Sequence, residues 1–213
     1  MNNVLNKKDS KQHILDVAAG LIARKGFAAV GIREIASKAK VNISMISYYF
    51  GGKVGILKEI NRVYYEKISY ALKEIKEDEN KLEIYFTKYT EILVNFFVEK
   101  RDYCRVAILE LPLEHPEIAE YKLEMIKINR KYMREYLKEK YYLLDKYQQV
   151  MIGPAFISLV FSNFLLSDLT RKTSKVNFDK KFYKKYSRTI STLFLYGMKG
   201  VVMENLKKKN EKK

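Results

Sequence analysis

Apolar residues recur at intervals of three and four along most of the chain, with polar residues between them. This period is that of one face of an α-helix. Leu, Ile, Lys, Glu and Tyr dominate the composition and there are only 3 Pro, which favours helices over strands or disorder. The pattern predicts helices over residues 9 or 10 to 25, 32–39, 43–49, 53–76, 82–100, 102–111, 116–141, 145–169 and 179–206.

The predicted helix over residues 53–76 is long enough to connect two domains. Its apolar face consists of Leu57, Ile60, Tyr64, Ile68, Leu72 and Ile75. We therefore predict an all-α protein, in which an N-terminal three-helix helix-turn-helix domain is joined by a long helix to a larger C-terminal helical domain. The predicted boundaries are residues 1–52 for the first domain, 53–206 for the second and 207–213 for a basic tail.

Residues near the N-terminus predict where the first helices begin and end. Asp9, with Gln12 three residues later, resembles a capping box, and Gly26 can take the left-handed conformation that ends a helix. Gly31 and Asn42 are suitable N-caps for the next two helices. Lys40 lies in the turn between them, where a left-handed lysine would cost about 1 kcal/mol.

The helix predicted from Ile43 has two distinct faces. Ile46 and Phe50 lie four residues apart and should point inward. The outward residues are small, polar or aromatic and include no acidic side chain: Ser44, Met45, Ser47, Tyr48 and Tyr49. Such a face suits the major groove of DNA better than it suits water or a protein core.

The charge agrees with a polyanionic partner. The 213 residues carry a formal net charge of +16, although a lysine-rich background is an alternative explanation. Residues 1–58 contain ten basic and three acidic side chains, a net charge of +7 on about a quarter of the chain. The N-terminal segment is therefore enriched in positive charge.

The single cysteine, Cys104, excludes an intramolecular disulfide and a cysteine-based zinc cluster, and it favours the reducing cytoplasm. The N-terminus lacks the apolar core of a signal peptide. Residues 147–167 contain no charge and are long enough to span a membrane, but seven polar, Gly or Pro residues interrupt them. We expect a buried or interface helix and no membrane partner.

Residues 10–58, about a quarter of the chain, resemble the DNA-binding domain of the TetR family of bacterial transcriptional regulators. The matching residues are Gly26-Phe27, Ile32-Arg33-Glu34-Ile35-Ala36, Ala39, Val41, Ile46-Ser47-Tyr48-Tyr49-Phe50, Lys53 and Leu57. The family often has Gly where this chain has Lys40. It commonly has Tyr and another large polar residue at positions 47 and 48, so this chain would read different bases.

The predicted DNA contacts follow from helix-turn-helix geometry and from the resemblance. The second helix of such a motif enters the major groove. Ser44 and Ser47 would contact base edges, and Met45 and Tyr48 thymine methyl groups. The resemblance implies phosphate contacts for Tyr49 and Lys53.

Arg33, at the start of a helix, is a further phosphate candidate. Each of these residues has an alternative role that involves no DNA. Tyr48 and Tyr49 could pack in the protein, and Lys53 could simply be solvated. Arg33 could pair with a carboxylate, and Met45 could fill a gap in the core.

The resemblance also implies a C-terminal domain that dimerises and holds a small-molecule pocket. The helices over about residues 145–169 and 179–206 could form a four-helix interface with their copies through Ile190, Leu193, Phe194, Gly197, Val201 and Val202. The pocket candidates, each of which could instead be ordinary core, are Phe86, Tyr89, Leu93, Phe96, Phe97, Tyr103, Met125 and Phe156. They would suit a lipophilic or aromatic ligand.

Enzyme motifs find little support. GxGxxG, P-loop and GxSxG patterns are absent from the sequence. His115 and Glu110 could bind a metal ion, but a simple turn between two helices explains His115 better. His13, the other histidine, lies in the first predicted helix. We expect no catalytic residue, metal or cofactor. The favoured function is a homodimeric repressor of a palindromic operator, released by a ligand. The alternative is a DNA-binding factor of the same fold without an inducer, with a nucleoid-associated or cell-division role.

Overall fold

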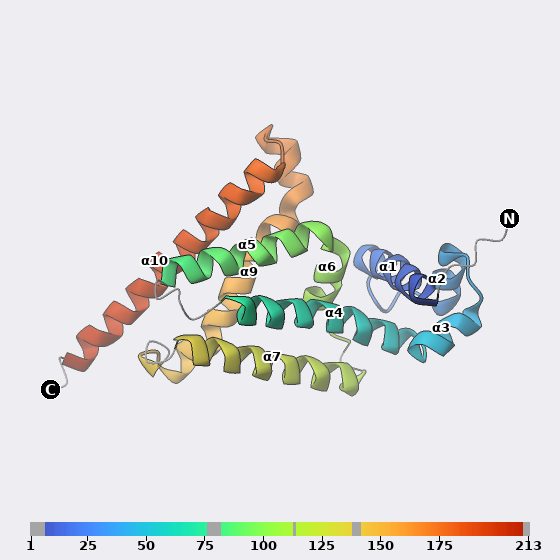
Figure 1. The fold of residues 1–213 in the computed structure, drawn as a ribbon, viewed down its shortest axis with the longest axis horizontal. Helices are drawn as coiled ribbons and strands as arrows, with labels where there is room; N and C mark the ends of the chain where they lie inside the picture. The colour runs from blue at the N-terminus through green and yellow to red at the C-terminus, as the bar shows by residue number, and fades with distance from the viewer. Residues whose placement is uncertain (1–6, 76–81, 113, 138–141, 211–213) are drawn as a thin grey trace. The chain divides into compact units, whose positions relative to one another are not determined.

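The computed structural model describes residues 7–75, 82–112, 114–137 and 142–210, and within these ranges its regular secondary structure is entirely α-helical (Figure 1). The all-α prediction is confirmed. The helices are α1 (Lys7–Lys25), α2 (Ile32–Ala39), α3 (Ile43–Phe50), α4 (Lys53–Glu74), α5 (Leu82–Glu99), α6 (Arg101–Leu109), α7 (Pro116–Leu137), α9 (Lys146–Ser174) and α10 (Lys180–Asn210).

Several helix ends differ from the prediction. Helices α4 and α6 each end two residues earlier, and α10 continues to Asn210, into the segment predicted as a basic tail. Helix α1 begins at Lys7, so Asp9 lies in its first turn and the predicted capping box with Gln12 is wrong. The Gln12 amide instead donates to Asp16 Oδ1 at 3.0 Å, one turn ahead. Helix α9 continues to Ser174, beyond the predicted end at 169, and the polar loop predicted from 170 begins only at Lys175. The end predicted for α7 at 141 lies outside the described residues.

The turns around α2 and α3 agree with the prediction. Gly31 and Asn42 are the N-caps, and Asn42 Oδ1 accepts from Ser44 N at 2.9 Å. Lys40 caps the end of α2 with φ 56°, a left-handed conformation that lets its N–H reach back to the last turn of the helix. Gly51 ends α3 in the same way with φ 69°. Short helices with caps at both ends are fixed in length, which defines where α3 presents its side chains.

The chain divides into two compact units. The first comprises residues 1–67 and 100–126, and the second comprises residues 68–99 and 127–213. Helices α4 and α7 each contribute to both units. Helix α6 and the first half of α7 therefore group with the helix-turn-helix, and the predicted boundary at residue 52/53 stays a prediction.

The first unit has a continuous apolar core. Ile14, Ile22 and Ile35 are completely buried in it, as are Leu57 and Ile60 of α4. All six predicted apolar positions, five on α4 and Ile75 directly after it, are buried, at 7% exposure or less. The helical period read from the sequence thus identified the inner face of this helix.

The core of the second unit is aromatic. The rings of Phe86 and Phe156 have centroids 5.6 Å apart, and Phe194 lies 4.8 Å from Phe156. Tyr89 stacks on Phe156 at 5.2 Å. Phe97 contacts Phe161 and Phe164 in the same unit. These edge-to-face and stacked contacts join α5, α9 and α10 into one packed cluster.

The pocket candidates divide between the units. Phe86, Tyr89, Leu93, Phe96, Phe97 and Phe156 belong to the second unit and are all buried. Tyr103 and Met125 belong to the first unit. Tyr103 is buried there and donates to Asp16 Oδ1 at 2.8 Å, while Met125 is half-buried. Tyr103 is therefore engaged in a structural hydrogen bond within its own unit.

Candidate nucleic-acid interface

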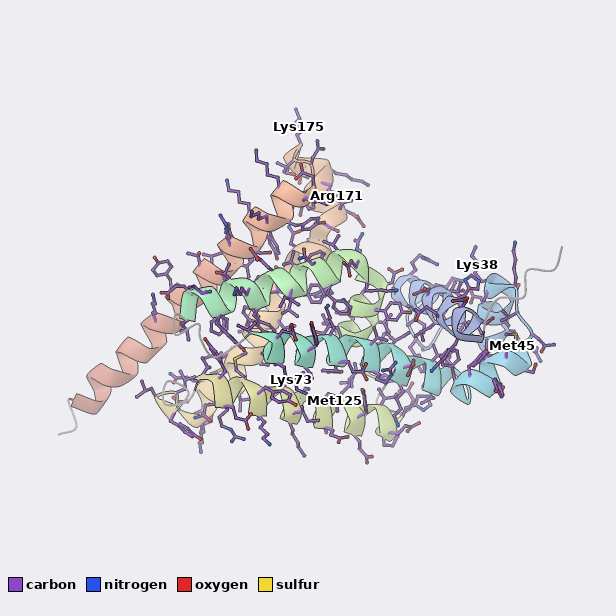
Figure 2. The ribbon with its side chains drawn as sticks, viewed as in Figure 1. Lys38, Met45, Lys73, Met125, Arg171 and Lys175 are labelled. Carbon is purple, nitrogen blue, oxygen red and sulfur yellow. The ribbon has the colours of Figure 1, made fainter. Side chains whose placement is uncertain are left out.

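Helix α3 presents a narrow exposed face. Ile46 is completely buried, whereas 73% of Tyr48 is exposed. Ser44 and Ser47 are also exposed, and the side chains on this helix include no acid. Met45, labelled in Figure 2, is half-buried and packs partly against the core. The residues most open to a partner are thus Ser44, Ser47 and Tyr48.

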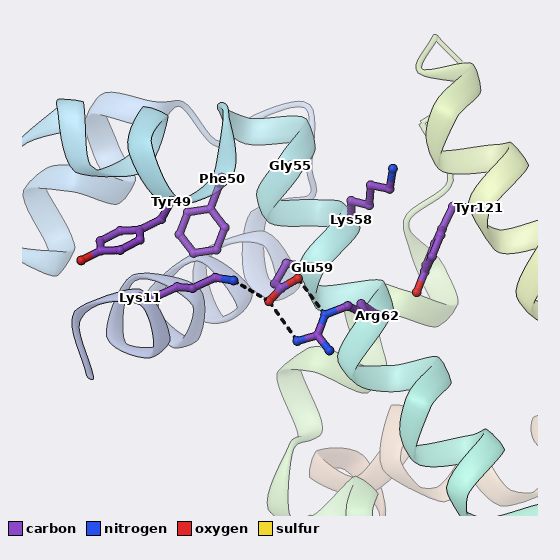
Figure 3. Close-up of a pocket in the computed structure, with 8 residues that line it drawn as sticks. All are labelled: Lys11, Tyr49, Phe50, Gly55, Lys58, Glu59, Arg62 and Tyr121. Atoms are coloured by element: carbon purple, nitrogen blue, oxygen red, sulfur yellow. Dashed lines mark hydrogen bonds and ion pairs between the residues drawn. The ribbon is translucent and has the colours of Figure 1, made fainter. Parts of the chain in front are cut away.

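Tyr49 lies at the edge of this face. Its ring is half-buried, contacts Tyr48 at a centroid distance of 5.0 Å and contacts Phe50 at 6.3 Å. It lines one side of a groove of about 280 Å³, and its hydroxyl points away from Glu59 (Figure 3). The aromatic ring of Tyr49 therefore packs against the protein, as the alternative role proposed, while its hydroxyl group stays available to a phosphate.

Lys53 is anchored rather than simply solvated. Its Nζ donates to the Phe27 carbonyl oxygen at 3.0 Å and lies 4.2 Å from the centroid of the Phe27 ring. Phe27 itself is buried. The charge of Lys53 is therefore held in one place at the start of α4, and its phosphate contact stays a prediction.

Arg33 is exposed in the first turn of α2. The neighbouring Glu34 carboxylate pairs with Lys25 at 2.5 Å. Among the residues that the structure describes, Arg33 has no ion pair, so the alternative of a carboxylate partner loses support. Its guanidinium is open to a phosphate near the start of the helix.

Sequence reasoning missed three exposed residues beside this face. Ile43 is 43% exposed directly after the Asn42 cap. Lys38 is exposed in the last turn of α2 and Lys40 is exposed as its C-cap, and Figure 2 shows Lys38 extending from this part of the fold. Their nearness to the turn was a usable signal, because side chains beside a helix-turn-helix turn face the same way as the start of the second helix.

A chain of ion pairs fixes α1 against α4 behind this face. Lys11 Nζ lies 3.0 Å from Glu59, and Arg62 lies 2.8 Å from the same carboxylate (Figure 3). Arg62 also lies 2.6 Å from Glu66. The hydrogen bond from Arg62, followed by that from Lys11, lowers the pKa of Glu59 to about 2. The groove in Figure 3 is lined by Lys11, Tyr49, Phe50, Gly55, Lys58, Glu59, Arg62 and Tyr121.

A lowered carboxylate pKa stabilises the folded state above the ordinary pKa, and this contribution is lost as the pH falls through the folded value. We therefore expect Glu59→Gln to reduce the free energy of unfolding near pH 7. The difference from wild type should shrink as the pH falls from about 4.5 to about 2. Urea unfolding midpoints measured at a series of pH values test this. A difference that does not vary with pH would contradict the role of the ionised carboxylate.

Helix α6 is tied to α1 within the first unit. Arg105 Nε donates to the Ala23 carbonyl oxygen at 2.9 Å, and the Glu110 carboxylate accepts from Phe27 N at 3.0 Å. The ammonium of buried Lys122, on α7, donates to the Ala107 carbonyl oxygen at 2.9 Å. Burial lowers the pKa of Lys122 to about 8. Glu110 thus has a structural role as a hydrogen-bond acceptor, which argues against the metal site considered above for His115 and Glu110.

The comparison with protein families agrees with this geometry. Residues 14–60 match the family model described as "Bacterial regulatory proteins, tetR family". The chain carries the TetR-family DNA-binding domain. The match covers α2 and α3 completely and the start of α4, and so includes every predicted DNA-contacting residue.

Two curated relatives share parts of the sequence. A segment of 66 residues is 41% identical to "Probable HTH-type transcriptional regulator YttP" of Bacillus subtilis (strain 168), covering 31% of this chain and 32% of that protein. A segment of 113 residues is 25% identical to "Uncharacterized HTH-type transcriptional regulator YuxN" of the same organism, covering 53% of this chain and 39% of that protein. The chain thus spans well under half the length of either relative.

Solved structures of TetR-family proteins share the fold. PfmR from Thermus thermophilus matches 86% of this chain and 97% of its own, with a TM-score of 0.66 and 17% identity. The fatty acid degradation regulator FadR from Bacillus halodurans matches 87% of this chain and 94% of its own, with a TM-score of 0.64 and 20% identity. At these identities the likeness is one of fold.

Proposed function

We propose that the protein is a transcriptional repressor that binds a palindromic operator as a homodimer in the cytoplasm and is released by a small lipophilic or aromatic ligand. The observation that carries the proposal is the exposed face of α3, on which Ser44, Ser47 and Tyr48 are open and no acid opposes DNA. A helix fixed by caps at both ends can enter the major groove as a rigid reader.

The proposal predicts a steep dependence of operator binding on salt, because each phosphate contact releases counterions. Anisotropy titrations with an operator duplex and a random duplex, each at several salt concentrations, test this. Operator binding should exceed random binding by about a thousandfold or more. Equal affinity for the two duplexes at every salt concentration would contradict a sequence-reading role.

The homodimer is supported by apolar side chains that α9 and α10 leave exposed. Leu166 and Leu169 of α9 are 52% and 66% exposed, and Leu193 and Tyr196 of α10 are 59% and 69% exposed. Helix α9 is also long and apolar enough to cross a membrane by length and composition. We favour a second copy as its cover, because the amide side chains of Gln148, Gln149 and Asn163 along this helix would be costly to place in lipid.

A charge in this face should separate the two copies. We expect Leu193→Glu to weaken self-association at least tenfold, because the carboxylate would be buried opposite its copy across the two-fold axis. Sedimentation equilibrium of the full chain measures this, and Leu123→Glu is the matched control, since Leu123 is 56% exposed on α7. If both variants associate as wild type does, α10 is not at the interface.

Ligand control requires that the ligand bind the released conformation more tightly than the DNA-bound one. Helices α4 and α7 each contribute to both units, so a change in the second unit can bias the first. Helix α6 follows α5 of the second unit directly in the chain, and within the first unit Arg105 and Glu110 bond to the end of α1 and the turn after it.

The second candidate is a DNA-binding factor without an inducer. It is favoured by the close packing of Phe86, Phe156 and Phe194, whose ring centroids lie 4.8–5.6 Å apart. Thermal unfolding in the presence of long-chain fatty acids and aromatic acids discriminates the two. A rise in Tm together with loss of operator binding supports the ligand-controlled repressor.

A further inference from the structure

The turn that joins α9 to α10 carries a dense set of basic side chains. Arg171, Lys172 and Lys175 are exposed at the end of α9, and Lys175 extends outward from the turn (Figure 2). The basic residues exposed at the start of α10 are Lys180, Lys181, Lys184, Lys185 and Arg188. These eight side chains are here named the tip surface, and all of them belong to the second unit.

Little negative charge compensates the tip surface. Residues 168–188 contain eight basic and two acidic side chains, a net charge of +6. Asp179, one of the two acids, accepts from Phe182 N at 2.8 Å and so caps α10. Within the described part of the chain, none of the eight cations forms an ion pair. This charge is denser than the +7 of residues 1–58, and its self-repulsion is relieved only by an anionic partner or by salt.

The five cations of α10 form a stripe. At 3.6 residues per turn, they lie within about 140° of the helix circumference and extend about 12 Å along its axis. The other side of the same turns is occupied by rings that pack on α9. Tyr183 stacks on Phe164 at 5.6 Å, and the Tyr186 hydroxyl donates to the Val160 carbonyl oxygen at 2.9 Å. The stripe is therefore carried by a helix whose rotation is fixed.

The end of α9 is ordered by similar contacts. The Arg171 guanidinium lies 5.0 Å from the centroid of the Phe178 ring, and Phe178 stacks on Phe182 at 4.0 Å. Arg171 also contacts the Tyr183 hydroxyl at 3.4 Å. A guanidinium held over a ring loses less conformational freedom when it binds an anion than a free side chain does.

The side chains between the cations indicate the kind of polyanion. A helix that lies on a membrane surface needs large apolar side chains on its exposed face. Among the described residues 171–188, Val176, at 48%, is the one exposed large apolar side chain, and the exposed Leu166 and Leu169 of α9 belong to the face assigned above to a second copy. A single valine offers too little apolar area to insert into a membrane surface. The phosphate backbone of duplex DNA, with one charge per about 1.7 Å of axis, needs only a row of cations.

We propose that the tip surface binds the phosphate backbone of duplex DNA without reading base sequence, as a second DNA contact distinct from α3. This goes beyond the proposed function, since a repressor needs only its recognition helices to find an operator. A protein with both contacts would hold a second duplex, or a second stretch of the same one, and would bind random DNA more tightly than α3 alone allows.

The test uses the full chain with Lys53→Ala, so that phosphate binding by the helix-turn-helix unit is reduced. Into this background are placed K180Q/K181Q/K184Q/K185Q, or the matched control K127Q/R130Q/K131Q/R134Q, which removes four exposed charges from α7 in the same unit. Binding is measured by the fluorescence anisotropy of a labelled random duplex of about 25 bp between about 50 and 200 mM salt. Circular dichroism spectra check that the variants have the same fold.

The tip variant should lower affinity for the random duplex at least tenfold and reduce the slope of log K against log salt by about 2–4, with little change in the control. Equal losses in the two variants would overturn the proposal, because they would reflect net charge alone. Tip-dependent binding to vesicles containing 30% phosphatidylserine, with duplex binding unchanged, would overturn it in favour of a membrane surface. Because the test uses a random duplex and no operator, its outcome can be interpreted even if the protein is not a repressor.

Discussion

Replacing Gly55 by Ala is expected to destabilise the N-terminal unit by about 3 kcal/mol or more, which corresponds to a fall in Tm of roughly 6–12 °C. Gly55 lies in the first turn of α4, and a Cβ there would collide with the Phe50 carbonyl oxygen. The neighbour is backbone and cannot turn aside, so α3 and α4 would have to separate. Ala is the better helix former by about 1 kcal/mol, so propensity alone predicts the opposite sign.

The matched control is Gly31→Ser in the same domain. A Cβ at Gly31 meets no atom within 4 Å, and this N-cap already has the extended backbone that serine accepts there. We expect Gly31→Ser to leave Tm unchanged or to raise it slightly. Thermal unfolding followed by circular dichroism compares the two variants. A Gly55→Ala protein as stable as wild type would show that the junction between α3 and α4 is looser than its close contact implies.

Tyr48→Ala and Lys53→Ala should affect DNA binding in different ways. Tyr48 stands out from the capped helix α3 and can contact base edges, so its loss should weaken operator binding by roughly 1–3 kcal/mol and leave random DNA nearly unaffected. Lys53 is held against Phe27 at the start of α4, where we expect its ammonium to meet a DNA phosphate and no base edge. Its loss should weaken every duplex alike and reduce the salt slope by about 1.

The control for Tyr48→Ala is Tyr142→Ala, which removes a tyrosine of similar exposure, 70%, from the second unit. It should bind both duplexes as wild type does. Operator and random duplexes titrated against all three variants give the comparison. If Tyr48→Ala and Tyr142→Ala behave alike, or if Lys53→Ala changes only operator binding, the roles given to these two residues are wrong.

Local rules in the sequence account for much of the fold. The period of Leu57, Ile60 and Tyr64 marked the buried face of α4, because helix geometry alone fixes which residues share a face. Asn42 capped α3 and Lys40 took the left-handed turn for similarly local reasons. Such features depend on residues within one helical turn of each other, so they can be predicted from the sequence alone.

Features that depend on distant residues could not be predicted in this way. Lys53 bonds to the Phe27 carbonyl, and Glu110 accepts from Phe27 N, across separations of 26 and 83 residues. Helix α9 continues past its predicted end because its core face packs on α5 and α10. The hydroxyls of Thr170 and Thr173 find acceptors inside the helix, at carbonyls one turn earlier and 3.0 Å away, so they do not need a loop to be satisfied. Polar composition alone had marked these residues as loop.

The central claim is that two copies of α3 read DNA as a pair. The most direct measurement is selection of bound fragments from the source genome by the full-length protein, followed by footprinting of the recovered site. The account predicts two inverted half-sites whose centres are about one helical turn, or a multiple of it, apart, and loss of the footprint with Tyr48→Ala. Recovery of fragments with no shared sequence, or of a single unpaired half-site protected equally well by Tyr48→Ala, would contradict it.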